Sequence, residues 1–479
     1  MSRKPSTADP ARRNFVSVVS LGCPKNQVDT ENLLGALVER DVVLCPDPAD
    51  ASVVIVNTCG FIAPARTEGT EVVEEMIALK RRGRCRRLVV AGCWVVREEE
   101  TLRERFPEVD VWLGLLTPAR VAWLVDRVLA DDAPVGAPPA GCEALAAETE
   151  RVRVSPPHWA YLKIADGCDN RCAYCTIPDI RGPLRSKPPD AVLDETRRLA
   201  DEGVLEVDLV AQDTTAWGHD LDGKPGLADL LRRMVRVDGI RWIRLLYTHP
   251  AHFTDELVDL IAGEPKVCEY VDLPIQHIVD RVLEAMGRRV TRARIESLIA
   301  RLRDAVPDVT LRTTVLVGFP GETEAEFAEL CAFLESTRFE RLGCFAWSPE
   351  AGTPAASLAG RVPEAERLRR ADAVMTLQRT IAFEIAESRV GRELPVIVDA
   401  FAGEGDGDGL VEEGDRHLFP HEAAEKRASP LPHDIFIGRT RADAPDVDPV
   451  VFLAGNTAPG RIERARITAA RGYDLVGIV

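Results

Sequence analysis

Three cysteines lie close together in the segment DGCDNRCAYCTIPDIRG, at Cys168, Cys172 and Cys175. Three residues separate the first pair and two separate the second, so one loop can bring all three thiolates around a single metal centre. Iron–sulfur clusters are typically bound by such closely spaced cysteines. Three protein ligands leave one coordination position open, which is a feature of catalytic rather than structural metal sites. The segment therefore predicts a catalytic iron–sulfur cluster.

A zinc site is the alternative interpretation of this segment, because zinc also binds three cysteines and one histidine at similar spacing. Zinc ligands usually occur in paired clusters, however. No histidine follows the cysteines within a few residues, and the next one along the chain is His219. The spacing favours iron over zinc.

A second set of three cysteines lies at the ends of apolar runs in the first third of the chain. The runs VSVVSLGC, ASVVIVNTC and RLVVAGC end at Cys23, Cys59 and Cys93, and helical-looking segments at 30–40 and 68–82 separate them. Strands that alternate with helices form parallel sheets, in which ligands bind outside the carboxyl ends of the strands. A single buried cysteine is often only a small apolar side chain. The repeated position predicts that these three converge on one crevice.

The remaining cysteines share no spacing, so we expect no common site for them. His249, His252 and His277 are possible ligands, but each cysteine set already supplies the donors for a cluster. We expect ordinary hydrogen-bonding roles for these histidines. The cysteines outside the two sets are Cys45, Cys85, Cys142, Cys268, Cys331 and Cys344.

The elements that would position both cysteine sets fall into separate domains. Residues 14–130 carry the pattern of a parallel-sheet α/β domain, and residues 131–157 form a linker rich in alanine and proline. Residues 158–382 contain six strand-like runs separated by helix-length segments, which predicts a partial (βα)6 barrel. Cys168 follows the first of these strands, and barrels carry their active sites at the carboxyl ends of their strands. The overall class is α/β.

The chain changes character again in residues 383–479, where short strand-like runs alternate with turn residues. This pattern predicts a small antiparallel β-barrel. Residues 402–434 interrupt it with nine acidic and three basic side chains. The GEGDGDG run within them lacks the spacing of an EF-hand calcium loop. We interpret these residues as a solvated acidic insertion.

Composition and charge restrict the class of protein and its partners. The 479 residues are 46% hydrophobic and 29% charged, as in ordinary globular proteins of more than one domain. No apolar run is long enough to cross a membrane, and the basic N-terminus lacks the apolar core of a signal peptide. We therefore expect a cytoplasmic protein with no membrane partner. The net charge of −17 favours a basic partner over nucleic acid.

The cysteine loop, with Tyr174 before its third cysteine, resembles the signature of the radical S-adenosylmethionine enzymes. The N-terminal cysteine set and a C-terminal barrel like a TRAM domain extend the resemblance to the methylthiotransferase family over nearly the whole chain. Several sequence motifs resemble, within this family, the branch of enzymes that modifies an aspartate of small-subunit ribosomal protein twelve. These motifs are LGCPKNQVDTE, VAQDTTAWG, YTHPAHFTDEL, YVDLPIQHIVDRVLEAMGR, TTVLVGFPGET and RADAPDVDPVV.

The resemblance implies that each cysteine set holds one 4Fe-4S cluster. Cys168, Cys172 and Cys175 would bind the cluster that cleaves S-adenosylmethionine and generates a radical at the β-carbon of the substrate aspartate. The second cluster, on the N-terminal cysteines, would deliver the inserted sulfur, and a second S-adenosylmethionine would supply the methyl group. An electron donor and a sulfur source of unknown identity are also implied.

Three further residues are candidate contacts of S-adenosylmethionine. Tyr174 lies beside the cysteine loop, while Gln212 and Arg312 lie in or after barrel strands, near the usual catalytic positions. The GFPGE segment at 318–322 predicts a turn that lets the backbone approach the cofactor. We further expect the C-terminal barrel to dock a basic protein surface and to be dispensable for cleavage of S-adenosylmethionine.

Two other functions remain open on the sequence alone. A transfer-RNA methylthiotransferase would share both clusters and all of the chemistry but would act on adenosine. A zinc-stabilised RNA-binding protein, in which the C-terminal barrel binds the ligand, represents a different class. The colour of the purified protein separates the second alternative, because iron–sulfur proteins are brown, and a substrate assay separates the first.

Overall fold

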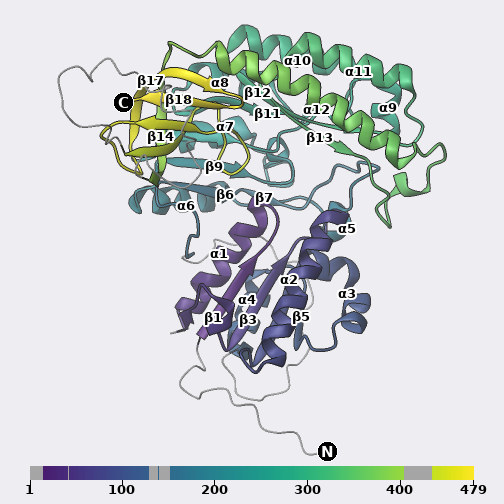
Figure 1. The fold of residues 1–479 in the computed structure, drawn as a ribbon, viewed down its shortest axis with the longest axis vertical. Helices are drawn as coiled ribbons and strands as arrows, with labels where there is room; N and C mark the ends of the chain where they lie inside the picture. Colours follow the sequence, from purple (N-terminus) through teal and green to yellow (C-terminus); the bar gives the residue numbers. More distant parts are fainter. Residues whose placement is uncertain (1–14, 41, 129–138, 140–150, 404–433) are drawn as a thin grey trace, which may run out of the picture.

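The protein is described from a computed structural model. The description covers residues 15–40, 42–128, 139, 151–403 and 434–479. Most of the 131–157 linker and almost all of the acidic insertion at 402–434 lie outside these residues. Three parts follow one another along the chain: an N-terminal α/β domain, a barrel above it, and a small β-barrel beside the central one (Figure 1).

The N-terminal domain is built on a parallel five-stranded sheet with the order β2-β1-β3-β4-β5. Two apolar cores cover its two faces. Helices α1 and α4 contribute to one core, and helices α2 and α3 contribute to the other. The elements are β1 (Phe15–Ser20), α1 (Pro24–Val38), β2 (Val43–Leu44), β3 (Val53–Thr58), α2 (Ala63–Arg81), β4 (Arg87–Gly92), α3 (Cys93–Arg105), β5 (Val111–Leu113) and α4 (Pro118–Val128).

The predicted alternation of strands and helices is confirmed in this domain, but β2 and β5 are additions to it. Both strands are only two or three residues long, so their apolar periodicity is too short to recognise. The predicted helix at 30–40 begins earlier, at Pro24, since proline is well placed in the first turn of a helix.

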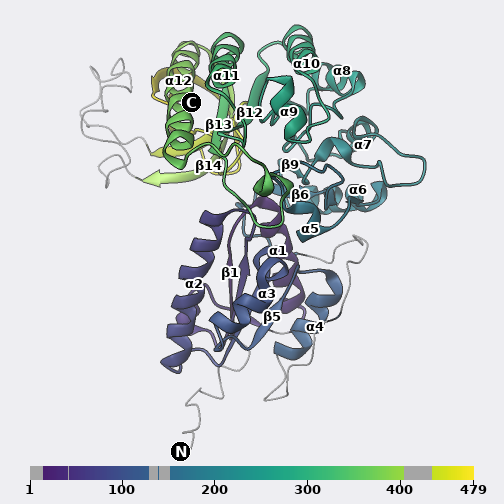
Figure 2. The same cartoon turned by 90° about the vertical axis from the view of Figure 1, so that its right-hand side faces the viewer.

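The central domain is an open barrel of six parallel strands in the order β13-β12-β11-β10-β9-β6, as predicted. Helices lie outside the strands (Figure 2). A large apolar core fills the space between the two layers. The strands are β6 (Trp159–Lys163), β9 (Glu206–Val210), β10 (Trp242–Leu245), β11 (Val267–Asp272), β12 (Thr310–Val317) and β13 (Arg341–Ala346). The helices are α6 (Pro189–Asp201), α7 (Leu227–Met234), α8 (Asp255–Gly263), α9 (Asp280–Ala285), α10 (Arg292–Ala305), α11 (Glu324–Thr337) and α12 (Glu364–Glu387).

Three short elements follow the first barrel strand and surround the cysteine loop. Strands β7 (Ala165–Asp166) and β8 (Arg185–Ser186) pair antiparallel and enclose the base of the cysteine loop. Helix α5 (Ile177–Arg181) follows the third cysteine and begins with proline in its first turn. The loop is therefore held at both ends by short regular structure.

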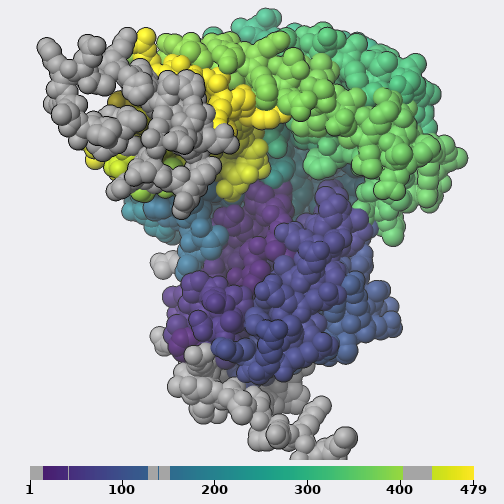
Figure 3. Space-filling model, in the orientation of Figure 1, coloured from purple at the N-terminus to yellow at the C-terminus, as the bar shows by residue number. Residues whose placement is uncertain are grey.

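The C-terminal barrel closes in the order β14-β15-β16-β18-β17, which confirms the predicted small β-barrel. Its pairs are antiparallel except for β16 with β18, which pair parallel. Figure 3 shows this barrel at the upper left, against the central domain. Its strands are β14 (Glu393–Gly403), β15 (Ile435–Thr440), β16 (Val451–Ala454), β17 (Ile462–Arg471) and β18 (Asp474–Ile478).

The C-terminal domain also supplies partners for polar side chains buried inside the central barrel. Arg439 of β15 pairs with Glu206 of β9 at 2.8 Å, and both side chains are buried. From the segment between β15 and β16, the Asp446 carboxylate accepts a hydrogen bond from the Tyr161 hydroxyl at 3.0 Å. Removal of this domain would therefore expose buried charges in the catalytic barrel. The expectation that it is dispensable for cleavage of S-adenosylmethionine does not fit these contacts.

We predict that Arg439→Ala lowers the free energy of unfolding by about 3 to 5 kcal/mol, because it leaves the buried Glu206 carboxylate without this partner. The Arg439 side chain is only 4% exposed. Denaturant unfolding measures the change. Arg464→Ala is the matched control from the same barrel: its side chain is 82% exposed, so we expect a change below about 1 kcal/mol. Equal effects of the two substitutions would contradict a structural role for the buried pair.

Candidate active site

The N-terminal cysteines meet at one edge of the parallel sheet. Cys23 precedes helix α1, Cys59 follows β3, and Cys93 begins helix α3. Gly22 has a φ of +98°, and a Cβ atom added there would lie 2.7 Å from Cys59 Cβ. Only glycine can therefore hold Cys23 this close to Cys59. The predicted convergence of the three strand ends is present in the fold.

Buried positive charge faces the three thiols. Burial acts to raise the pKa of Cys23, but the nearby charges of Lys25 and Arg181 lower it below the ordinary value. The pKa of Cys93 rises to about 12, because burial outweighs the effect of Arg181 and the neighbouring thiols add to the rise. Thiolates this close repel one another. A metal centre that binds all three would relieve that repulsion.

The cysteine loop of the central barrel is fixed by backbone hydrogen bonds. The Cys168 N–H donates to the Gly182 carbonyl at 3.1 Å, and the Cys175 N–H donates to the Cys172 carbonyl at 3.1 Å. Burial raises the pKa of Cys168 to about 11 and that of Cys175 to about 12. Arg288, from the loop after α9, lies 3.9 Å from Cys172 Sγ. These thiols thus also lie together in a partly buried loop.

Arg181, the last residue of α5, joins the two cysteine sets. Its guanidinium donates to Asp166 at 3.0 and 3.1 Å within the barrel, and to Asn26 at 2.8 Å and Asp29 at 3.1 Å in the N-terminal domain. Just before it, Ile180 packs against Cys93. The helix that leaves the cysteine loop therefore ends against the N-terminal thiols and links the two sets.

This junction was not identified from the sequence. Arg181 is 1% exposed, and its role depends on Asn26 and Asp29, which lie more than 150 residues away along the chain. The only local sign of its role in the sequence is that an arginine lies in the short segment TIPDIRG, directly after the third cysteine. Buried arginines are rare unless they are paired, but burial of this one is not evident from its neighbours in the sequence.

Of the three candidate cofactor contacts, Gln212 is the one left with unmet hydrogen-bonding capacity. It lies just after β9, and both its Oε1 and Nε2 atoms are buried without a hydrogen-bond partner among the described residues. A buried amide without partners is costly, so the Gln212 side chain is free to bind polar groups of a ligand. Such an amide fits the polar groups of S-adenosylmethionine.

Arg312 and Tyr174 are already engaged. Arg312 pairs with Asp272 at 3.0 Å and lies 3.5 Å from Asp448 of the C-terminal segment. Its charge is thus largely balanced within the protein. Tyr174 packs against the apolar group that includes Phe319 and Trp347. Their assignment as cofactor contacts remains a prediction.

The predicted turn at 318–322 is present. Gly318 has a φ of +71°, and its N–H and that of Phe319 both donate to the Glu322 carboxylate, at 2.8 and 3.2 Å. A Cβ atom on Gly318 would lie 2.3 Å from Cγ of Arg367. The close approach that requires glycine here is therefore to a side chain of α12.

Two residues without a glycine's freedom adopt left-handed backbone at the carboxyl ends of neighbouring strands. Tyr247, after β10, has a φ of 59°, and Gln276, after β11, has a φ of 70°. The ammonium of Lys25 lies 3.2 Å from the centre of the Tyr247 ring. Such strain is retained where the surrounding structure needs it, often at functional sites. The left-handed backbone of Tyr247 places its ring against Lys25, close to Cys23.

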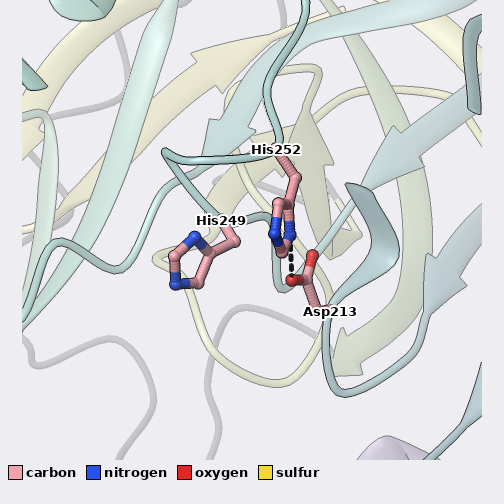
Figure 4. A group of neighbouring side chains, drawn as sticks. All are labelled: Asp213, His249 and His252. Carbon is pink, nitrogen blue, oxygen red and sulfur yellow. Dashed lines mark hydrogen bonds and ion pairs between the residues drawn. The ribbon is translucent and has the colours of Figure 1, made fainter. Parts of the chain in front are cut away.

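Asp213 is a further residue of the site that the sequence did not reveal (Figure 4). Its carboxylate accepts a hydrogen bond from Asn170 of the cysteine loop at 2.7 Å and lies 2.7 Å from Nδ1 of His252. His249 stacks on His252, and its Nδ1 accepts the Ala251 N–H at 3.1 Å. The three side chains could hold a metal ion. Their existing hydrogen bonds instead match the ordinary roles predicted for His249 and His252, with Asp213 holding the loop.

His277 is buried too, and its Nε2 lies 4.0 Å from the Glu322 carboxylate. Its Nδ1 accepts the Val279 N–H at 3.1 Å, which agrees with a hydrogen-bonding role. Burial lowers the pKa of His277 to about 4. The ring is therefore neutral near pH 7.

Comparisons with known proteins agree with this geometry. Residues 162–334 match the radical SAM superfamily, residues 15–114 match uncharacterized protein family UPF0004, and residues 431–479 match the TRAM domain. The chain is 44% identical over 461 residues to the ribosomal protein uS12 methylthiotransferase RimO of Anaeromyxobacter sp. strain Fw109-5, covering 96% of this chain and 92% of that protein. The chain belongs to the RimO family.

A second relative and one solved structure extend the comparison. The RimO of Geobacter sulfurreducens is 41% identical over 466 residues, which cover 96% of this chain and 98% of that protein. The radical S-adenosylmethionine methyltransferase TsrM of Kitasatospora setae has a similar fold, with a TM-score of 0.54 and 17% identity over 83% of this chain and 79% of its own. Membership of the RimO family makes the chain a transferase and rules out the zinc-stabilised RNA-binding protein.

The cofactors of this family are two 4Fe-4S clusters and S-adenosylmethionine, and the residues fit all three. Each cysteine set offers three thiolates that lie together, and thiolate is the ligand that iron–sulfur clusters prefer. The Gln212 amide supplies unmet hydrogen bonds inside the barrel. No helix among the described residues is long and apolar enough to cross a membrane.

We predict that the reconstituted protein binds about eight iron atoms, four for each set of three cysteines. Replacing Cys23, Cys59 and Cys93 by alanine should halve the iron and leave reductive cleavage of S-adenosylmethionine to 5′-deoxyadenosine measurable. The same change at the three loop cysteines should halve the iron and abolish cleavage. Iron analysis and product chromatography measure both.

A double variant, Cys331→Ala with Cys344→Ala, is the control for this experiment. These two thiols are close enough for each to influence the other, yet they belong to neither set. We expect the control to keep all of the iron. Full iron content in the N-terminal triple variant would show that the second cluster is held elsewhere.

We predict that Gln212→Ala weakens binding of S-adenosylmethionine by about tenfold, as expected for the loss of one or two hydrogen bonds. Anaerobic titration calorimetry of the cluster-loaded protein measures the affinity. Gln378→Ala is the control, since the Gln378 amide is buried but donates to the Phe339 carbonyl at 2.9 Å, away from the site. This control should lower stability without changing the affinity. Unchanged affinity in Gln212→Ala would remove this residue from the cofactor site.

Proposed function

We propose that this enzyme inserts a methylthio group at the β-carbon of one aspartate of ribosomal protein uS12. The observation that carries the proposal is the link that Arg181 makes between two sets of three cysteines, in a chain of the RimO family. Methylthiolation of an unactivated carbon needs both a means of breaking a C–H bond and a source of sulfur. Two adjacent metal centres can provide both at one place.

We assign the ligands of the two clusters residue by residue. Cys168, Cys172 and Cys175 hold the cluster that binds S-adenosylmethionine, and Cys23, Cys59 and Cys93 hold the second cluster. Support comes from the proximity of the thiols within each set and from the buried charges of Arg181 and Lys25 beside the second one. When bound, these cofactors supply one-electron chemistry that acid–base groups of ordinary pKa cannot provide.

The chain's own residues position the reactants and exclude water. Arg181 fixes the distance between the two cysteine sets, because its hydrogen bonds reach both domains. Asp213 restrains the cysteine loop through Asn170. Gln212 orients S-adenosylmethionine. A reacting carbon must be held within about 3 to 3.5 Å of the group that attacks it, so rigid anchoring of both sets is a requirement of the reaction.

The charge of the chain supports a protein substrate. Ribosomal proteins are basic, so a chain with a net charge of −17 attracts them at long range and repels the phosphates of transfer RNA. We propose that the enzyme acts in the cytoplasm, where its substrate is made, and that it takes its sulfur from a separate source. Added salt should slow association with uS12, because exposed charges are screened over about 8 Å at physiological ionic strength.

Mass spectrometry of ribosomal proteins and transfer RNA from cells with and without this gene tests the proposal. We expect uS12 from cells with the gene to carry one methylthio group on an aspartate, and uS12 from deleted cells to lack it. A gene copy with the three loop cysteines changed to alanine should not restore the group. Methylthio-adenosine that depends on the gene, with the aspartate unmodified, would assign the enzyme to transfer RNA instead.

A further inference from the structure

A cationic pocket opens beside the cysteine loop of the barrel, on this otherwise acidic protein. It has a volume of about 740 Å³ and lies between the loop, the segment after β10 and the connection from α9 to α10. Arg171, Arg289 and Arg294 are exposed around it, while Arg288 lies buried in its wall. Asp280 and Glu284 are the acidic residues of the lining. The four arginines therefore outnumber the acids two to one.

The exposed arginines of this pocket are available for an external partner. Elsewhere on the surface, arginines such as Arg303 and Arg369 pair with glutamates. Within the described part of the chain, no carboxylate lies within ion-pair distance of Arg171, Arg289 or Arg294. The Arg294 guanidinium donates to the Phe253 carbonyl. Of the two acids, Asp280 already accepts the Arg292 N–H. The two acids offset part of the charge of the four arginines, so the lining keeps a net positive charge.

The cysteine loop itself forms part of this pocket, through Arg171, which directly precedes Cys172. Arg288 lines the pocket and lies 3.9 Å from Cys172 Sγ. The backbones also touch: the Ala173 N–H donates to the Met286 carbonyl at 2.8 Å, and a Cβ atom on Gly287 would lie 2.8 Å from the Arg171 carbonyl oxygen. A partner bound in the pocket would therefore approach the loop cysteines closely.

The pocket meets the loop at a different place from the N-terminal domain. The residues after Cys175 lead through α5 to Arg181 and the N-terminal thiols. The pocket instead meets the loop at Arg171 and Cys172. A partner bound in the pocket leaves α5 and Arg181, which link the two cysteine sets, uncovered. This separation suits a component that must act on the loop cluster while the substrate is bound.

We propose that Arg171, Arg289 and Arg294 form the docking surface for an acidic one-electron carrier protein that reduces the cluster of the cysteine loop. The inference rests on the proposed function only in requiring that cluster. The reduced carrier loses one electron and the cluster gains it, and no bond is formed or broken. Opposite charge favours this encounter, since long-range attraction speeds association and orients the two proteins. The acidic remainder of the enzyme would repel the carrier, so attraction is concentrated at this pocket.

Charge reversal at the pocket tests the proposal with a flavodoxin as the carrier, because the colours of its redox states allow its oxidation to be followed. The variant is Arg171→Glu, Arg289→Glu and Arg294→Glu in the cluster-loaded enzyme. Two readouts do not require turnover: the dissociation constant for the flavodoxin, and the rate at which reduced flavodoxin bleaches the cluster in stopped flow. We expect binding on the order of tenfold weaker and a similar loss in the rate of reduction. Higher salt should reduce the difference from the unchanged enzyme.

Two controls separate docking from damage. Arg84→Glu with Arg236→Glu and Arg241→Glu changes the net charge equally at exposed positions outside the pocket, and it should bind and accept electrons like the unchanged enzyme. Dithionite, a small reductant that needs no docking surface, should reduce the cluster of the pocket variant at the unchanged rate at high salt, which screens the charge of its anion. A slower dithionite reaction would show that these arginines support the loop and would overturn the proposal.

Three further outcomes would also overturn it. One is equal flavodoxin binding by the pocket variant and the unchanged enzyme. Another is an equal loss in the charge-matched control. The third is a pocket variant that loses affinity for transfer RNA but not for flavodoxin, which would make the pocket a phosphate-binding surface. Failure to modify uS12, together with the expected flavodoxin results, would disprove the proposed function and leave the docking surface intact.

Discussion

The buried guanidinium of Arg181 is the interaction on which the arrangement of the site depends. A charge with 1% exposure is costly unless its partners surround it, and Asp29, Asp166 and Asn26 do so from two domains. Loss of Asp29 or Asp166 would leave part of this buried charge without compensation. The two domains are therefore held in one relative position, in which the helix that follows the cysteine loop ends against the N-terminal thiols. An apolar contact of similar size would be less demanding about direction and distance.

Much of this molecule could be predicted from its sequence, because its signals are local. Each strand of the N-terminal triplet ends at a cysteine, and the loop cysteines lie within eight residues of one another, so spacing alone indicates the chemistry. The six barrel strands are apolar runs of ordinary length, which periodicity detects. The five strands of the C-terminal barrel are visible for the same reason.

The contacts between domains could not be predicted in this way. Arg181, Asp213 and Arg439 look like ordinary charged residues in the sequence, and only the fold shows that each is buried beside a distant partner. The candidate cofactor contacts also differ in whether the fold gives each side chain a partner. Gln212 has unmet hydrogen bonds, whereas Arg312 is paired with Asp272 and lies near Asp448 of the C-terminal segment. Position in or after a barrel strand suggested Gln212 and Arg312, and position beside the cysteine loop suggested Tyr174. Position alone could not reveal which side chain already has its hydrogen-bond partners.

The hydrogen bond between Tyr161 and Asp446 has a consequence for the order in which the chain folds. Its two ends are 285 residues apart, and His158 and Asp399 are 241 residues apart. Domains generally fold as units during synthesis, from the N-terminus onward. The N-terminal thiols and the loop cysteines therefore emerge from the ribosome long before the last strands fill the barrel interior. Until then, Tyr161 and Glu206 inside the barrel lack the partners that the C-terminal domain supplies, so the complete barrel interior assembles only after those strands have been made.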